Sequence, residues 1–190
     1  SLIPFGFWAA SGAGGGAGAF DLLETTTLST SASSVTFSGL GAYSDYKHLQ
    51  IRSVARSDFG SVVSGALRVR FSGDSGSNYV KYHRLAGNGS SVSSNGELTG
   101  TSLELYHVPG ANADSGAFNS MVMDILDFNS TSKFKTARTM IGSYSHSTSV
   151  FVHLMSGLYM STSAITSTTF TLSSGANFIA GSRFSLIGIK

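Results

Sequence analysis

Residues 121–142 read MVMDILDFNSTSKFKTARTMIG, a stretch in which two strand-like patterns meet across a short polar turn. The first pattern alternates between two faces, with Phe118, Ser120, Val122, Asp124 and Leu126 on one and Met121, Met123 and Ile125 on the other. Both faces carry apolar residues, which is typical of a strand buried on two sides. Residues 129–132 supply the short polar side chains of a turn, and residues 134–141 return as a second strand. The stretch therefore predicts a central hairpin.

Outward from this hairpin, the rest of the chain also reads as short strands separated by turns, with no competing helical pattern. The candidate strands cover residues 20–28, 34–37, 46–57, 67–71, 79–85, 150–156, 157–160, 164–172 and 183–189. The first two are expected to form an edge or outer pair, and residues 87–100 and 109–116 are interpreted as long polar loops. Strands at this spacing predict an all-β fold, either an antiparallel β-sandwich or a barrel.

Composition limits both the domain count and the class of partner. The chain has 190 residues, of which 41% are hydrophobic and only 12% are charged, and this length suits one well-packed domain. A net charge of +2 provides no basic stripe, so we expect no nucleic acid partner. The apolar residues 2–10 have no basic residue before them and are too few to span a bilayer, so neither a secretory signal nor a membrane partner is expected.

The N-terminus differs from the rest of the chain and is interpreted as an arm over residues 1–19, with the β-sandwich domain over residues 20–190. Ile3, Phe5, Phe7 and Trp8 form an aromatic-rich group, and a glycine-rich tether follows over residues 12–18. Many glycine-rich termini are disordered tails because glycine loses much backbone entropy on ordering. However, exposed aromatic side chains would create an aggregation site. We therefore favour an arm whose four apolar residues dock on a partner.

Residue patterns for catalysis or metal binding do not converge anywhere in the sequence. The five histidines are scattered singly: His48, His83, His107, His146 and His153. Surface or packing roles are expected for them, because none has the spacing of a metal site. The chain contains no cysteine, which excludes disulfides and cysteine-ligated zinc. We expect no enzyme activity, no catalytic residue, no cofactor and no metal site.

Three acidic residues, Asp124, Asp127 and Asp74, lie in or near predicted turns. Asp124 and Asp127 are three apart, so a regular strand would point them to opposite faces, and they are not interpreted as a catalytic pair. Asp124 is expected to pair with an arginine such as Arg138, and Asp127 to cap the turn. In the loop of residues 71–79, Asp74 and Asn78 could contact calcium, but one carboxylate is too little for an assigned site.

Several short motifs together point to one class of protein. They are SVTF (34–37), YKHLQIR (46–52), LRVRF (67–71) with Gly73-Asp74 and Gly76-x-Asn78-Tyr79 after it, LAGNGS (85–90), DILD (124–127), SGLYM (156–160) and AGSRFSL (180–186). Over nearly the whole domain they resemble small structural proteins of tailed bacteriophage virions, of the decoration or tail-fibre-like kind. The resemblance implies an all-β particle component of jelly-roll type, attached through an N-terminal segment.

The resulting hypothesis is a non-enzymatic exterior protein of a phage virion, assembled in the bacterial cytoplasm and serving as capsid decoration (cement). A fibre needs a long shaft, whereas 19 residues span at most roughly 60 Å. We also predict a homo-oligomer, preferably a trimer, that contacts other virion proteins such as the major capsid or tail proteins. The alternative is a tail fibre or tail-tip protein whose head binds a receptor or host surface glycan through Tyr79, Tyr82, Tyr144 or Tyr159.

Overall fold

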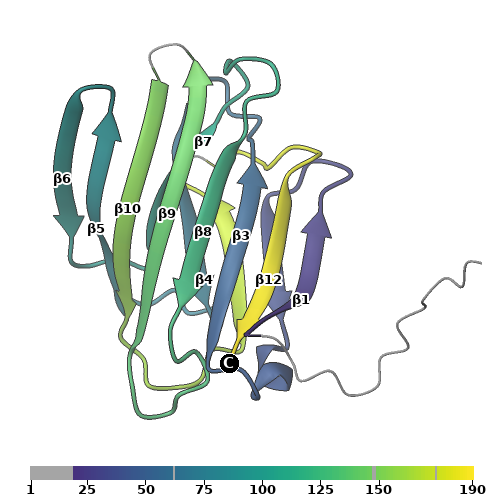
Figure 1. Ribbon diagram of the computed structural model, residues 1–190, viewed down its shortest axis with the longest axis vertical. Helices are drawn as coiled ribbons and strands as arrows, with labels where there is room; N and C mark the ends of the chain where they lie inside the picture. Colours follow the sequence, from purple (N-terminus) through teal and green to yellow (C-terminus); the bar gives the residue numbers. More distant parts are fainter. Residues whose placement is uncertain (1–18, 62, 147–148, 174) are drawn as a thin grey trace, which may run out of the picture.

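The computed structural model describes residues 19–61, 63–146, 149–173 and 175–190, which form two antiparallel sheets packed face to face (Figure 1). The large sheet has the strand order β1-β12-β3-β8-β9-β10-β5-β6, and the small sheet has the order β2-β11-β4-β7. The strand bounds are β1 Phe20–Thr27, β2 Ser34–Ser38, β3 His48–Ala55, β4 Val63–Phe71, β5 Tyr79–Asn88, β6 Ser91–Glu97, β7 Leu103–Pro109, β8 Asn119–Ile125, β9 Lys135–His146, β10 Ser149–Tyr159, β11 Ser167–Leu172 and β12 Arg183–Ile189. A short 3-10 helix, Leu40–Tyr43, joins β2 to β3.

Eight of the strands form a jelly roll, as expected for this chain. The four strands β1-β12-β3-β8 face the four strands β2-β11-β4-β7, and the chain changes sheet at every connection except β5–β6, β8–β9 and β9–β10. Two further hairpins, β5–β6 and β9–β10, are inserted between these strands. Both join the large sheet beyond β8, so this sheet extends past the edge of the small one. We call these four strands, β9, β10, β5 and β6, the extension.

The predicted central hairpin is confirmed as β8–β9, but the expectation that its first strand is buried on two sides is wrong. Met121, Met123 and Ile125 point into the sandwich and are almost fully buried. Val122 and Asp124 lie on the other face of the sheet and are only partly buried. The large sheet has no second layer over this face among the described residues. The alternation in the sequence therefore predicted the strand correctly, but the prediction that a second layer covers its outer face was wrong.

Two other expectations about the strands need correction. The first two strands do not pair with each other, because β1 is an edge of the large sheet and β2 an edge of the small one. Residues 87–100 are not a long loop, because β6 lies within them and pairs with β5. Every residue of the edge strand β6 is exposed. Because neither face is buried, its sequence does not alternate between apolar and polar residues. The strand is specified by backbone pairing instead.

The hydrophobic core lies between the two sheets and is rich in phenylalanine. Phe170 on β11 packs against Phe184 on β12 with 5.3 Å between ring centroids, and Phe178 contacts the same ring at 5.2 Å. These rings join the two sheets, and each adds aromatic contact to its area burial. Within the described part of the chain, no helix has the length and hydropathy that crossing a bilayer requires.

Candidate binding surfaces on the sheet extension

A network of charged side chains fixes the extension to the small sheet. Lys81 on β5 lies 3.2 Å from a carboxylate oxygen of Glu104 on β7 and 2.9 Å from Glu97 on β6. Arg68 on β4 contacts Glu104 at 2.8 Å. Burial opposes the charge on Lys81, but the two carboxylates outweigh it and raise the pKa of the ammonium. The overhanging strands β5 and β6 are therefore anchored by ion pairs that reach both sheets.

The outer face of the extension carries a group of exposed apolar side chains, which we call the outer patch. Met140, Leu154 and Leu85 face one another in one row across β9, β10 and β5, and Val152 lies in the adjacent row. Their exposed fractions are 57%, 57%, 50% and 58%, respectively. Beside them a shallow groove of about 770 Å³ is lined by residues that include His83, Leu85 and Leu154. Contiguous exposed apolar surface of this kind is typical of an interaction site.

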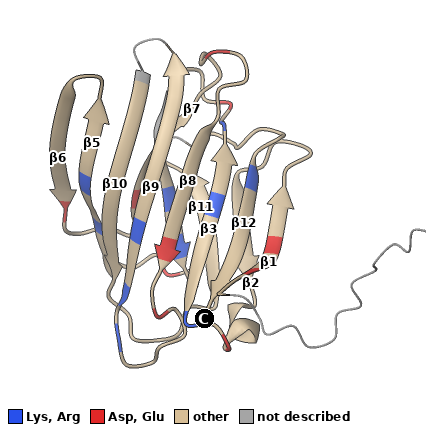
Figure 2. Cartoon of the chain, viewed as in Figure 1, with Lys and Arg blue, Asp and Glu red and all other residues tan. Residues whose placement is uncertain are grey.

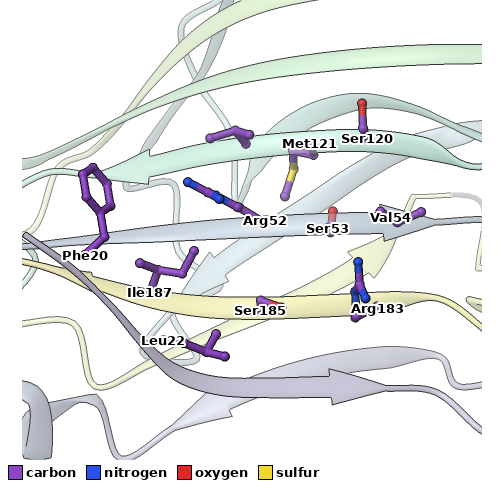
Figure 3. Close-up of a pocket in the computed structure, with 11 residues that line it drawn as sticks. Phe20, Leu22, Arg52, Ser53, Val54, Ser120, Met121, Arg183, Ser185 and Ile187 are labelled. Carbon is purple, nitrogen blue, oxygen red and sulfur yellow. The ribbon is translucent and has the colours of Figure 1, made fainter. Parts of the chain in front are cut away.

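The same apolar character continues onto the jelly-roll half of this face. A second groove, of about 560 Å³, lies between β1 and β8 and is lined by Phe20, Leu22, Val54 and Ile187, together with Arg52 and Arg183. Figure 3 shows these side chains around the groove, on strands β1, β12 and β3. Phe20 and Leu22 are 57% and 68% exposed. Both ends of the large sheet thus present apolar side chains on its outer face.

The outer face of the small sheet is different in chemistry. It presents hydroxyl and charged side chains in cross-strand rows: Ser34, Thr171, Arg68 and Glu104 in one, and Thr36, Thr169 and Arg70 in the next. Thr36 and Thr169 share a hydrogen bond between hydroxyls 3.0 Å apart. Figure 2 shows further charged positions on strands of the large sheet, among them β3, β8, β9 and β12. The outer face of the small sheet is therefore hydrophilic. The outer face of the large sheet has apolar groups at both ends, with the charged residues Arg52, Asp124 and Arg138 between them.

On its inner side, the extension forms a cleft beside β7, the edge strand of the small sheet. This inner cleft has a volume of about 300 Å³, and its lining includes Arg84, Tyr106, His107, Phe151 and His153. The His153 ring lies between Tyr106, at 5.0 Å, and Phe151, at 5.7 Å. The guanidinium carbon of Arg84 lies 3.7 Å from the centroid of the Tyr106 ring. A cation and four aromatic rings thus converge on one hollow.

Among the described residues, the inner cleft buries three side-chain nitrogens that have no hydrogen-bond partner. His153 is 1% exposed, and neither its Nδ1 nor its Nε2 has a hydrogen-bond partner among the described residues. The Nε of Arg84 is also buried and unpaired within that part of the chain. Burial, followed by the nearby charges of Arg84 and His107, lowers the pKa of His153 to about 4. The imidazole is therefore neutral at pH 7.

A buried lysine, Lys135, lies at the turn of the central hairpin β8–β9. The Nζ of Lys135 is within 3.1 Å of four backbone carbonyl oxygens, those of Ser130, Ser161, Thr162 and Ser163. Burial lowers the pKa of Lys135, while the four oxygens stabilise the ammonium that donates to them. This lysine ties the β8–β9 turn to the segment after β10, so we assign it a structural role.

The sequence-based expectations for binding residues have mixed outcomes. The arm residues Ile3, Phe5, Phe7 and Trp8 lie outside the described residues. Tyr79, Tyr82 and Tyr159 are buried in the core, so they cannot form the exposed sugar platform considered for them. Tyr144 is exposed, but its hydroxyl donates to Asp114 at 3.0 Å. Packing in the hydrophobic core accounts for the three buried tyrosines.

The structure shows the partners of Asp124, Asp127 and Asp74, for which the sequence had suggested roles. Asp124 pairs with Arg138 at 2.8 Å, as expected, and Asp127 binds Lys133 within the turn at 2.8 Å. In the 71–79 loop, the carboxylate of Asp74 accepts hydrogen bonds from the backbone N of Gly76, the side chain of Asn78 and the hydroxyl of Tyr159. These bonds, with that of Asn78 first, lower the pKa of Asp74. The loop's own donors therefore occupy the oxygens that a calcium ion would need.

The five histidines are scattered in the sequence, but two of them meet in the fold. His107 on β7 and His153 on β10 come together with 6.3 Å between ring centroids. Sequence spacing could not reveal this pair, because residues 103–109 were not identified as a strand. No cluster of three or more potential metal ligands occurs among the described residues. The family models, curated proteins and solved structures compared with this chain include no match to it.

Proposed function

We propose that this protein is a non-enzymatic structural component on the exterior of a tailed-phage virion, that it assembles as a homo-oligomer, and that it serves as capsid decoration. The observation that carries the proposal is the contrast between the two outer faces of the sandwich. Among the described residues, the outer patch of Met140, Leu154, Leu85 and Val152 is apolar and exposed, whereas the small sheet presents hydroxyl and charged groups. In this proposal, the apolar face contacts a second copy and the hydrophilic face meets solvent.

The size of the outer patch supports self-association. Full burial of a large apolar side chain contributes roughly 1.5–3 kcal/mol, and about half of each patch residue is still exposed, so covering the remainder contributes roughly 1 kcal/mol per residue. Four such residues from each subunit offset a substantial part of the entropy lost on association. The low charged fraction of the chain, 12%, leaves little repulsion between copies. A trimer remains our preferred state.

Attachment to the particle is assigned to the N-terminal arm. The arm joins the domain at β1, an edge strand whose Phe20 and Leu22 line the second groove of the apolar face. Several arms around an oligomer would bind a particle surface with avidity, although each arm alone binds weakly. Jelly rolls occur in viral capsid proteins and in lectins, so the fold is compatible with this role without specifying it.

The second candidate function is a tail fibre or tail-tip protein whose head binds a receptor or host glycan. The inner cleft favours this alternative, because concave sites lined by aromatic rings and a few polar groups are typical of small-ligand binding. It ranks second because the tyrosines expected to form a sugar platform are mostly buried.

Sedimentation velocity of the full chain, with paired variants, tests self-association. Leu154→Lys places a charge in the outer patch, and Thr169→Lys places the same charge on the outer face of the small sheet. We expect the unaltered chain and Thr169→Lys to be oligomers at tens of micromolar, and Leu154→Lys to be at least about a hundredfold weaker in association. A monomeric unaltered chain, or equal weakening by the two variants, would contradict the proposal.

The virion role needs a separate test on particles. Cryo-EM of virions assembled in the presence of the full chain should show its density on the capsid exterior, and a chain without residues 1–19 should leave those positions empty. Density at the tail alone would favour the second candidate. Density from the truncated chain at normal occupancy would show that the arm is not needed for attachment and that the sandwich itself contacts the particle.

A further inference from the structure

In the described part of the chain, the inner cleft contains buried polar groups without hydrogen-bond partners. Buried polar atoms in folded proteins almost always have a partner, and each exception needs an explanation. Here three such atoms lie together: the two ring nitrogens of His153 and the Nε of Arg84. They belong to two neighbouring strands, β10 and β5, where His153 and Ala86 are paired residues. Their clustering at one cavity distinguishes this place from the isolated unpaired hydroxyls of Ser53 and Thr168.

The orientation of the Arg84 guanidinium suits it to binding an anion. Its guanidinium lies over the Tyr106 ring at 3.7 Å and is also 6.0 Å from the Tyr82 centroid. Stacking of this kind leaves the edge of the guanidinium free, and that edge matches the two oxygens of a carboxylate or phosphate. No carboxylate of the described residues forms an ion pair with Arg84. The cleft lining contains no acidic residue, so its one full charge is positive.

The remaining lining suits a small polyhydroxylated ring. Asn88, Ser91 and Ser93 place amide and hydroxyl groups on the rim formed by β5 and β6, and all three are exposed. Phe151 contributes a partly exposed aromatic ring on the opposite wall, against which the apolar face of a sugar can pack. A volume of about 300 Å³ is at the lower end of the range for small-molecule sites. It therefore suits a single ring better than a long oligosaccharide.

From these contacts we infer that the inner cleft binds a sugar ring carrying one anionic group, with Arg84 holding the anion and the serines and asparagine of the β5–β6 rim binding hydroxyls. His153 is almost fully buried at this cleft and supports the site by packing between Tyr106 and Phe151. The anion is a carboxylate or a phosphate, since a guanidinium binds both. The inference rests on the cleft alone and holds whether or not the protein belongs to a virion.

The neutral state of His153 agrees with this assignment. Its pKa is lowered to about 4 by burial, by Arg84 and by His107, which are the groups that face it from β5 and β7. The nearby Tyr106 is the other titratable group in contact with the ring. An anion placed on Arg84 would offset part of the positive field at His153. Binding should therefore raise the pKa of His153 from its value in the free protein.

NMR titration of the full chain tests the inference with three probes: glucuronate, glucose 6-phosphate and glucose. We expect at least one charged sugar to shift the backbone amide signals of Ala86 and Ser93 saturably at millimolar concentration, and to raise the pKa of His153. Glucose should shift them at least about tenfold more weakly. Which charged sugar binds more tightly identifies the anion. No saturable shift with either charged sugar, or equal shifts with glucose, would overturn the inference.

Matched variants separate binding at the cleft from general charge effects. Arg84→Met keeps the apolar stem over Tyr106 and removes the guanidinium, and it should weaken the charged probe at least about tenfold. Arg183→Met removes an exposed arginine from the opposite face of the same sheet and should bind as the unaltered chain does. Dispersed amide spectra establish that both variants are folded. Unchanged binding by Arg84→Met, or equal losses in both variants, would show that the cleft is not the site.

Discussion

His153 should make the stability of the domain depend on pH between about 4 and 6.5. Its pKa in the fold is about 4, compared with 6.5 for an unperturbed histidine. The unfolded chain therefore binds a proton in this window that the folded chain does not, and the free energy of unfolding falls as the pH falls. At 1.36 kcal/mol per pKa unit, the full contribution is about 3 kcal/mol. It is present above pH 6.5 and lost as the pH approaches 4.

His153→Phe removes this titration while keeping an aromatic ring between Tyr106 and Phe151. Urea unfolding at pH 7.0, 5.5 and 4.0 gives the free energy of unfolding for both proteins at one protein concentration. The absolute stability of the variant is not the readout, because the larger ring also changes packing. The difference between the two proteins should move by about 2–3 kcal/mol in favour of the variant as the pH falls from 7 to 4.

Titrating groups that do not contact His153 act equally in both proteins and cancel in this difference. They include Asp114, whose pKa is lowered by its hydrogen bonds from His146 and then Tyr144. A difference that stays constant within about 0.5 kcal/mol from pH 7 to pH 4 would refute the reasoning, because it would mean that His153 takes up its proton in the fold as readily as in the unfolded chain.

Three further outcomes are expected. Lys135→Met should lower the free energy of unfolding by about 2–4 kcal/mol, because it leaves four backbone carbonyls without their donor; chemical denaturation measures it, and a loss below about 1 kcal/mol would contradict the structural role. Tyr159→Phe removes one hydrogen bond to Asp74 and should cost about 1 kcal/mol in the same assay, with no change in the circular dichroism spectrum. Deletion of residues 1–19 should leave the far-ultraviolet spectrum of a β-sandwich unchanged, and a loss of folding would show that the arm belongs to the core.

Alternation in the sequence was sufficient to identify strands that have one buried face and one exposed face. Leu49 and Ile51 point into the sandwich while Arg52 is exposed, so β3 was identified from its pattern. The same reasoning missed β6, because a strand exposed on both faces has no alternation to detect. An all-β fold was predictable from such strands, and β5, β9 and β10 were themselves identified in part, but their joining to one side of the large sheet was not predicted.

The binding surfaces were less accessible to sequence reasoning than the fold. The inner cleft depends on the position of β7 beside β10 and β5, and the 45 residues between His107 and His153 contain no spacing signal. The outer patch was visible as apolar residues, but a sequence pattern does not reveal what covers a face. Met140 and Leu154 therefore became recognisable as exposed only in the folded chain.

The central claim is that the apolar face of the large sheet is covered in the assembled protein, and hydroxyl-radical footprinting of Met140 tests it most directly. This side chain is 57% exposed in the single chain, whereas Met121, Met123 and Met155 are at most 3% exposed and serve as internal controls. Oxidation of methionine to its sulfoxide follows exposure and can be counted by mass spectrometry.

The full chain is labelled at a concentration that favours the assembly and again after dilution below its dissociation constant. The account predicts that oxidation of Met140 is suppressed at least about fivefold in the assembly and recovers on dilution, while the three buried methionines stay protected throughout. Equal oxidation of Met140 at both concentrations, in a chain that sedimentation shows to be oligomeric at the higher one, would contradict it, because the subunits would then meet through another surface.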